Sequence, residues 1–470
     1  MKLIFKFGGT SLSSGQNIER VVRIVKDYVD RRDRVVVVCS AMDDVTDLLI
    51  ELTREASSGD HQRIESAVSE LNKMHIEAVE AVIRGREVRE TIVRLINGRL
   101  EDLRRALLGV SYLREVTPRS QDYILSFGER LSTTIVWGAL KDWGVDAVYL
   151  EGGDAGIVTN SNFGEALPIM EVLVREVREK VGGLLDEGRV PVITGFIGKN
   201  TEGVITTLGR GGSDYTATLI GYAINADEVW LWTDVDGLMT ADPRVVKDAK
   251  VLSKVSFEEA IEMALFGAKG LHPRALEPAK QANIRVRIKN TFNPQSPGTL
   301  IGGNARQSST CTVKGVMLVR NAGMITVRGP SMVGRPGTAA KILGVFAKEN
   351  VNVMMISQSV SESSISVVVR REWVKRLKEV LEREMLTDEE VEKIEAEDDV
   401  SVVAVVGEGM KGTPGVAGKV FSAIANKKIN VRMIAQGSSE LNISFVVKES
   451  DALEAVRALH EEYRLRELET

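Results

Sequence analysis

The chain has 470 residues, of which 43% are hydrophobic and 27% are charged, and its formal net charge is −5. These values are typical of a soluble globular protein with two or three domains, and nothing in them points to binding of nucleic acid or of an anionic membrane. Two cysteines, Cys39 and Cys311, exclude a disulfide framework, and with only four histidines we expect no His/Cys metal site. We therefore expect a cytoplasmic protein with no nucleic-acid or membrane partner.

The N-terminal part of the chain predicts alternating strands and helices. Residues 3–7 predict a first strand that passes directly into Gly8-Gly9, so we expect no signal peptide. Residues 18–28 follow with the spacing of an amphipathic helix. Residues 34–39 contain four consecutive valines, which is typical of a strand buried on both faces. This alternation predicts a parallel sheet with crossover helices.

A long helical insert, residues 46–108, interrupts this pattern. Further strands are predicted at 147–150, 190–194, 204–207 and 229–233. Residues 284–288 predict the last strand of the sheet, and the stretch 293–298 predicts a loop near the domain boundary. The predicted strands before this last one end in glycine, polar or acidic residues. Because ligands bind beyond the carboxyl ends of parallel strands, we expect these ends to gather at one site.

Two glycine-rich turns carry cations. Leu208-Gly-Arg-Gly-Gly-Ser-Asp214 precedes a predicted helix, so backbone N–H groups and the positive end of the helix dipole could face a phosphate. Lys6-Phe-Gly-Gly-Thr-Ser11 places a lysine at the end of the first strand. Each could be an ordinary surface turn. Together they predict a phosphoryl group held from two sides, although neither is a P-loop and the first turn has no G-x-G-x-x-G.

Three further motifs are open to two interpretations. Thr233-Asp-Val-Asp-Gly237, with Asp242-Pro-Arg244 after it, is either a solvated turn or a nucleotide platform that contacts adenosine or a metal ion. Phe127-Gly-Glu-Arg130 is either a charged helix start or part of a site. Gly267–Pro273 places Lys269 in a turn, where a surface lysine is the default, and we expect His272 to be structural because a proline follows it.

The C-terminal third contains an internal repeat. Residues 334–369 align without gaps on 412–447, at an offset of 78 (412 − 334), with 17 identities in 36 positions. Each copy predicts a strand, a glycine turn, a helix, two strands and a helix. The second copy lacks a final strand, which residues 312–319 could supply. We therefore expect the first unit to be inserted within the second.

In chain order, five motifs precede the repeat: Lys6–Ser11, Ser126–Ser132, Leu208–Asp214, Trp232–Gly237 and Phe266–Lys269. This succession resembles the aspartate kinases (aspartokinases) of the amino-acid-kinase superfamily, whose C-terminal repeats are ACT domains. The resemblance implies an α/β catalytic domain at 1–305, with a mainly parallel open sheet sandwiched by helices. It also implies two α+β ACT modules of βαββαβ, ferredoxin-like form. We expect the first at 322–398 and the second at 306–321 plus 399–470.

The resemblance implies transfer of the ATP γ-phosphoryl group to the side-chain carboxylate of L-aspartate, with Mg²⁺, on the way to lysine, threonine and methionine. It implies that Lys6 and Asp214 are catalytic. It also implies that Arg210 binds a carboxylate of the substrate and that Glu129 binds its α-ammonium group. The full aspartate site would be Ser40, Thr46, Glu129, Arg210 and Ser213. The nucleotide site would be Lys6, Gly8, Gly9, Ser11, Thr233, Asp234, Met239, Arg244 and Lys269. No residue is assigned as a direct metal ligand.

The nucleotide side departs from the family pattern. Relatives often have a tyrosine where Met239 stands and a larger apolar residue where Gly270 follows Lys269. The resemblance therefore does not predict which side chains pack against adenosine. The aspartate side shows no such departure.

The repeat implies amino-acid effector sites and a homodimer or a higher homo-oligomer formed through the ACT modules. The Gln-x-x-Ser-Glu pattern of both copies favours threonine over lysine, while loss of binding in one or both copies is the alternative. The effector residues would be Met332, Gly337, Gln358, Ser361, Gly415, Gln436, Ser439 and Glu440.

Two other functions fit part of the sequence. A kinase of glutamate or of a nucleotide monophosphate such as UMP would share the glycine turns, but the tandem repeat argues against it. A non-catalytic amino-acid sensor would keep the fold, but the intact Lys6, Arg210 and Asp214 argue against that.

Overall fold

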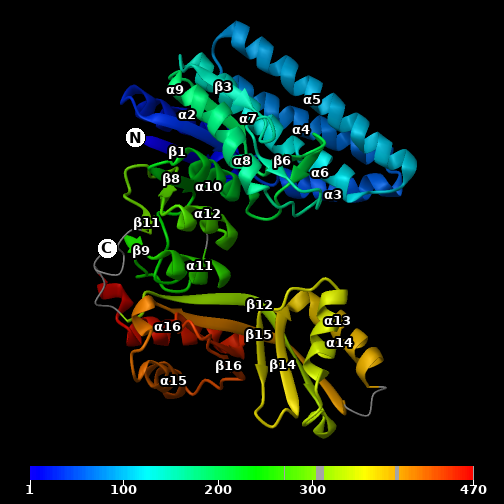
Figure 1. The fold of residues 1–470 in the computed structure, drawn as a ribbon, viewed down its shortest axis with the longest axis vertical. Coiled ribbons are helices and arrows are strands. Elements are labelled where there is room, and N and C mark those ends of the chain that lie inside the picture. The colour runs from blue at the N-terminus through cyan, green and yellow to red at the C-terminus, as the bar shows by residue number, and fades with distance from the viewer. Residues whose placement is uncertain (269, 303–311, 387–390, 469–470) are drawn as a thin grey trace. The chain divides into compact units, whose positions relative to one another are not determined.

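A computed structural model describes residues 1–268, 270–302, 312–386 and 391–468 (Figure 1). The chain forms two compact units. The first contains Met1–Leu238, Ser253–Phe257 and Lys269–Ala305, and the second contains Met239–Leu252, Glu258–Ala268 and Arg306–Thr470. A search of the described residues finds no helix with the length and apolarity needed to cross a membrane.

The main sheet of the first unit has eight strands in the order β3-β5-β2-β1-β8-β10-β11-β9. From β3 to β10 each strand is parallel to its neighbours, which confirms the predicted open α/β sheet. The strands are β1 (Lys2–Phe7), β2 (Arg34–Cys39), β3 (Ala147–Leu150), β5 (Val190–Thr194), β8 (Glu228–Thr233), β9 (Lys254–Val255), β10 (Arg285–Asn290) and β11 (Thr299–Ile301). The valines of β2 are buried, as expected for a strand covered on both faces.

Two strand predictions were wrong. Residues 284–288 are not the last strand, because β11 follows β10 and pairs with it antiparallel. Strand β7 (Ile205–Thr207) does not join the parallel sheet but pairs antiparallel with β6 (Ile197–Asn200), next to β4 (Val158–Thr159). In both cases the connection is too short for the crossover of about a dozen residues that a parallel pair needs.

Helices flank the main sheet, and the predicted insert forms the three helices α3 (Val45–Ser58), α4 (His61–Val82) and α5 (Arg86–Leu113). Figure 1 shows α4 and α5 as long neighbouring helices. The remaining helices are α1 (Gly9–Leu12), α2 (Gly15–Asp30), α6 (Pro118–Leu125), α7 (Phe127–Asp142), α8 (Met170–Val177), the π-helix η1 (Arg178–Gly182), α9 (Gly183–Asp186), α10 (Gly212–Ile224), the 3₁₀ turn η2 (Pro273–Ala275) and α12 (Leu276–Gln281). Helices α7 and α10 start beside the carboxyl ends of the central strands and so carry the site.

The second unit contains one antiparallel sheet in the order β13-β14-β12-β15-β17-β16, which holds both copies of the repeat. Its strands are β12 (Gly315–Arg328), β13 (Met355–Gln358), β14 (Ser364–Arg370), β15 (Lys393–Val406), β16 (Met433–Ala435) and β17 (Asn442–Lys448). Its helices are α11 (Phe257–Leu265), α13 (Thr338–Lys348), α14 (Arg371–Met385), α15 (Val416–Asn426) and α16 (Ala452–Glu462).

The two copies share the long strands β12 and β15. The first part of β12, Gly315–Val319, pairs with Val402–Val406 beside β17, so it supplies the strand that the second copy lacks. The second part pairs with the beginning of β15 and belongs to the first copy. The register shifts between Val319 and Met324, where Asn321 has a φ of 56°. The expected boundaries at 321/322 and 398/399 therefore lie inside continuous strands.

Two segments that sequence analysis placed in the catalytic domain belong to the second unit. The backbone oxygen of Thr240 accepts a hydrogen bond from the Val316 N–H at 2.8 Å, and its hydroxyl lies 3.0 Å from His460 Nε2. In α11, Glu262 accepts a hydrogen bond from Asn442 at 2.7 Å. Through these contacts, residues 239–252 and 258–268 pack against the second copy of the repeat.

Candidate active site

A cavity of about 280 Å³ lies at the carboxyl ends of β1 and β2 in the first unit. Its walls come from these strand ends, from the first turns of α3 and α7, and from the glycine-rich loop before α10. The structure brings together here all the residues expected to hold aspartate and both expected catalytic residues, which are Lys6, Ser40, Thr46, Glu129, Arg210, Ser213 and Asp214.

An ion pair joins the two expected catalytic residues. Lys6 Nζ, near the end of β1, lies 2.5 Å from Asp214 Oδ1 in the first turn of α10, and the two side chains are only 13% and 12% exposed. Because water is largely excluded, this attraction is screened less than that of a surface pair. The pair fixes the lysine charge at the cavity wall.

The glycine-rich loop adopts a conformation that its glycines permit. Gly209 and Gly211 have φ values of 76° and 72°, in the left-handed region, and Gly211 is the N-cap of α10. Ser213 and Asp214 are buried, whereas Arg210 is exposed. The loop therefore presents an exposed cation and the N-terminus of a 13-residue helix to the cavity, and both favour an anion there.

Glu129, in the first turn of α7, is buried without a counter-charge in hydrogen-bonding contact. One carboxyl oxygen accepts a hydrogen bond from the Ala41 N–H at 3.1 Å, and the other is buried with no hydrogen-bond partner among the described residues. Burial raises the pKa of Glu129 to about 8, although the Ala41 hydrogen bond and the charge of Lys6 lower it in part. The cavity thus contains an acid that a bound cation would ionise.

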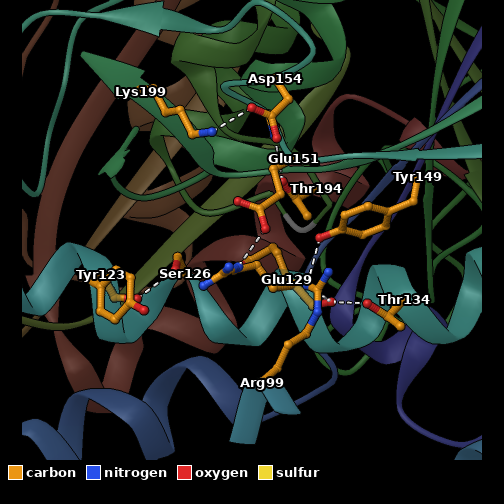
Figure 2. A network of polar contacts seen from close by, with 12 residues as sticks. Arg99, Tyr123, Ser126, Glu129, Thr134, Tyr149, Glu151, Asp154, Thr194 and Lys199 are labelled. Atoms are coloured by element: carbon orange, nitrogen blue, oxygen red, sulfur yellow. Dashed lines mark hydrogen bonds and ion pairs between the residues drawn. The ribbon is translucent and has the colours of Figure 1, made fainter. Parts of the chain in front are cut away.

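A polar network holds the first turns of α7 against the end of β3 (Figure 2). Arg130 pairs with Glu151 at 2.8 Å, and its backbone oxygen accepts hydrogen bonds from Arg99 at 2.7 Å and Thr134 at 2.6 Å. Arg99 also donates to the Tyr149 hydroxyl at 2.7 Å. The network fixes the helical turn that carries Glu129.

Sequence analysis missed acidic residues at the cavity mouth. Asp43, Asp44 and Asp47 line the cavity, and burial together with the charges of Asp44 and Asp234 raises the pKa of Asp43. Their position directly after β2, where the strand ends gather, was the signal that could have identified them. In the described ranges no group of three or more His, Cys, Asp or Glu side chains is arranged to hold a metal ion.

The residues expected to bind the nucleotide do not all line this cavity, unlike those expected to bind aspartate. Gly8 and Gly9 form the turn after β1, and Thr233 and Asp234 follow the neighbouring strand β8. The Ser11 hydroxyl is fully buried against Thr291 at 2.7 Å, which is a structural contact.

Two others lie elsewhere, and a third is not described. Met239 and Arg244 lie in the second unit, where Arg244 pairs with Asp242 at 2.6 Å. Lys269 lies outside the described residues, as does Cys311.

The two copies of the repeat build the same turn around their expected effector residues. The carboxylates of Glu362 and Glu440 accept hydrogen bonds from Gly334 and Gly412 at 2.8 and 2.7 Å. Gly337 and Gly415 are the N-caps of α13 and α15. Met332 is buried beneath the first turn, while the polar residues Gln358, Ser361, Gln436 and Ser439 are exposed.

Comparison with known proteins identifies the family of this chain. The amino acid kinase family matches residues 1–290, and the ACT domain matches residues 325–385 and 403–463. Aspartokinase 2 of Arabidopsis thaliana chloroplasts is 34% identical over 465 residues, which cover 97% of this chain and 83% of the relative. The bifunctional aspartokinase/homoserine dehydrogenase 1 of the same plant is 33% identical, and the chain spans 51% of its length. The chain thus spans about half the length of such bifunctional relatives.

Solved structures agree along nearly the whole chain. Escherichia coli aspartokinase III in complex with aspartate and ADP has a TM-score of 0.80 and 31% identity, and the match covers 98% of this chain and 99% of that one. The same enzyme with lysine and aspartate has a TM-score of 0.81, with the same identity and coverage. The chain therefore belongs to the amino acid kinase family and, within it, to the aspartokinases.

The burial of Glu129 predicts a pH-dependent cost in stability. Folding raises the pKa of Glu129, so the side chain ionises more readily in the unfolded state than in the folded state. The free energy of unfolding therefore falls as the pH rises from about 4.5 to about 8. Glu129→Gln removes this cost. Without substrate, we expect its melting temperature to exceed that of the wild type by several degrees at pH 8.5 and by much less at pH 5.

Glu77→Gln, at an exposed position on α4, is the control and should show no such trend. A difference between Glu129→Gln and wild type that stays constant with pH would contradict the assignment of a raised pKa to Glu129.

Proposed function

We propose that this member of the aspartokinase family transfers the γ-phosphoryl group of ATP to the side-chain carboxylate of L-aspartate and forms 4-phospho-L-aspartate. One observation carries the proposal: a single cavity gathers the Lys6–Asp214 pair, the exposed Arg210 and Glu129, one of whose oxygens has no hydrogen-bond partner among the described residues. The complex of E. coli aspartokinase III with aspartate and ADP supports it.

The cavity offers a complementary group for each charge of aspartate. The planar guanidinium of Arg210 suits the α-carboxylate, which it can bind through two parallel hydrogen bonds. The free carboxyl oxygen of Glu129 suits the α-ammonium, and binding of that cation would lower the raised pKa of Glu129. Ser40, Thr46 and Ser213 offer hydroxyls beside them. With its α-groups held, aspartate directs its side chain toward Lys6.

The chemistry requires no general base. The side-chain carboxylate has an ordinary pKa near 3.9 and is already a nucleophile at neutral pH. One of its oxygens forms a bond to the γ-phosphorus while the bond to the bridging oxygen breaks, and ADP leaves. The barrier is the approach of two anions, so catalysis consists of positioning and charge stabilisation. Lys6, held by Asp214, supplies the fixed positive charge.

The acidic residues at the cavity mouth fit the Mg²⁺ that accompanies ATP. Asp44 and Asp234 help to raise the pKa of Asp43, which shows an excess of negative charge that a cation would relieve. Mg²⁺ sites commonly use one or two carboxylates together with nucleotide phosphates. Asp43 and Asp234 would hold the ion, which would neutralise part of the phosphate charge.

A substrate panel tests the function. With ATP and Mg²⁺, we expect ADP release and acyl-hydroxamate formation with aspartate. We expect neither of these products with glutamate, and no ADP release with UMP. Turnover of glutamate or UMP in place of aspartate would identify a different kinase of this family. An absence of turnover with all three would favour a non-catalytic sensor.

Lys6→Ala tests the role of the fixed charge. We expect kcat to fall by about 10²- to 10³-fold, as for loss of other groups that stabilise transition-state charge, while the KM for aspartate changes only a few-fold. Lys2→Ala is the matched control, since Lys2 lies on the same strand but donates to the Ile224 backbone oxygen at the opposite end. A near-normal kcat in Lys6→Ala would remove Lys6 from this role.

We further propose that an amino acid inhibits the enzyme through the turns of the repeat, with threonine favoured and lysine as the alternative. The Gln-x-x-Ser-Glu pattern supports threonine, whereas E. coli aspartokinase III was solved with lysine. Gln358→Ala and Gln436→Ala should raise the inhibitory concentration of the effector, measured in separate titrations with both amino acids. Gln62→Ala, exposed on α4, serves as the control. Unchanged inhibition in both variants would contradict this placement.

A further inference from the structure

The glycine-rich loop needs support that its own sequence does not supply. Gly209 and Gly211 lie in the left-handed region, and glycine loses more conformational entropy on ordering than any other residue. The loop nevertheless has to place the side chains of Arg210, Ser213 and Asp214 at the cavity wall. Contacts from outside the cavity must therefore restrict it.

The entry to the loop is fixed by a buried carboxylate. Asp122 of α6 is completely buried and accepts hydrogen bonds from the Thr207 N–H and the Thr207 hydroxyl, each at 2.8 Å. It also accepts one from the Gly164 N–H at 3.0 Å. Asp122 does not line the cavity. These contacts end at Thr207, before the glycines, where the backbone hydrogen bonds are Leu208 N–H to the Phe196 oxygen and Gly212 N–H to the Gly209 oxygen, each at 2.9 Å.

Arg274, in the turn η2, continues the support into the loop. Its Nη1 donates to the Leu208 backbone oxygen at 3.1 Å, and its Nη2 donates to the Ala166 backbone oxygen at 3.4 Å. The guanidinium lies 4.7 Å from the ring centroid of Tyr215, in the first turn of α10. One planar cation thus contacts both ends of the loop, together with the neighbouring segment at Ala166.

The same turn contacts the middle of the loop. A Cβ atom added to Gly211 would lie 2.4 Å from the Cβ and Cγ atoms of His272, so the histidine packs directly against this glycine. His272 was expected to be structural, and this position agrees with that expectation. Arg274 differs from it because its two backbone hydrogen bonds and its ring contact depend on the geometry of a guanidinium.

We propose that Arg274 is a positioning residue of the phosphoryl-transfer site, which holds the Leu208–Asp214 loop in the conformation that presents Arg210 and Asp214 to the substrates. The inference rests on the proposed function for its effect on catalysis, but the restraint of the loop can be measured independently. Because a displacement of about 1 Å can cost up to 10²-fold in rate, loosening this loop should lower activity without removing any group from the cavity.

Arg274→Ala and Arg274→Lys test the proposal in the full-length protein. We expect faster amide hydrogen exchange at residues 208–213 in both variants, and a loss of about tenfold or more in kcat/KM for aspartate. Lysine cannot reproduce the two carbonyl contacts and the ring contact at once, so it should not restore activity. Added guanidinium at non-denaturing concentration should partly restore Arg274→Ala.

Arg287→Ala is the matched control, because Arg287 also lies over an aromatic ring, that of Trp230, and pairs with Glu228 away from the cavity. The proposal would be overturned if Arg274→Ala kept both its amide hydrogen exchange at residues 208–213 and its kcat/KM for aspartate within twofold of wild type. An equal loss in Arg287→Ala, or a loss in Arg274→Ala that guanidinium leaves unchanged, would overturn it too. If the wild type transfers no phosphoryl group, the proposed function fails, while the exchange experiment still decides whether Arg274 restrains the loop.

Discussion

The site depends on the ion pair between Lys6 and Asp214, which joins the first strand of the chain to a helix that begins far along it. Strand β1 lies between β2 and β8 in the middle of the parallel sheet, so its backbone has little freedom to move. Helix α10 is fixed by almost complete burial. A cation carried by the central strand and a carboxylate carried by a buried helix can therefore meet at 2.5 Å and keep that geometry.

The charges around this pair bear on the proposed binding of aspartate, a zwitterion with an additional carboxylate. Lys6 is neutralised in part by Asp214, so Arg210 remains as an exposed cation of the cavity wall. Glu129 keeps one buried oxygen without a partner, at a cost in folding free energy that grows as the pH approaches its raised pKa. Functional sites commonly contain such strained or unsatisfied groups, because the ligand supplies the missing partner.

Much of this arrangement could be predicted from sequence because strand ends are local signals. The predicted bounds of β2, β3 and β5 match the structure, and the residues that follow β1 and β2 do line one cavity. Strands β7 and β11 were misplaced because composition does not distinguish parallel from antiparallel pairing, which connection length decides here. Asp122 and Arg274 left no signal, since their partners are backbone groups 85 and 66 residues away that only the folded chain brings close.

The second unit shows why the catalytic and regulatory sequences cannot be divided at one residue. Lys314 and Glu259 form a buried pair at 3.0 Å, and Glu259 also accepts a hydrogen bond from the Glu408 N–H in the second copy of the repeat. With the Thr240 and Glu262 contacts, this attaches α11 and residues 239–252 to that copy. Met239 and Arg244, which family resemblance assigns to the nucleotide, therefore lie in a segment whose residues Ala241, Val245 and Val246 share a core with the ACT sheet. Since β12 and β15 run through both copies, a rearrangement in either one acts on strands that the other also uses.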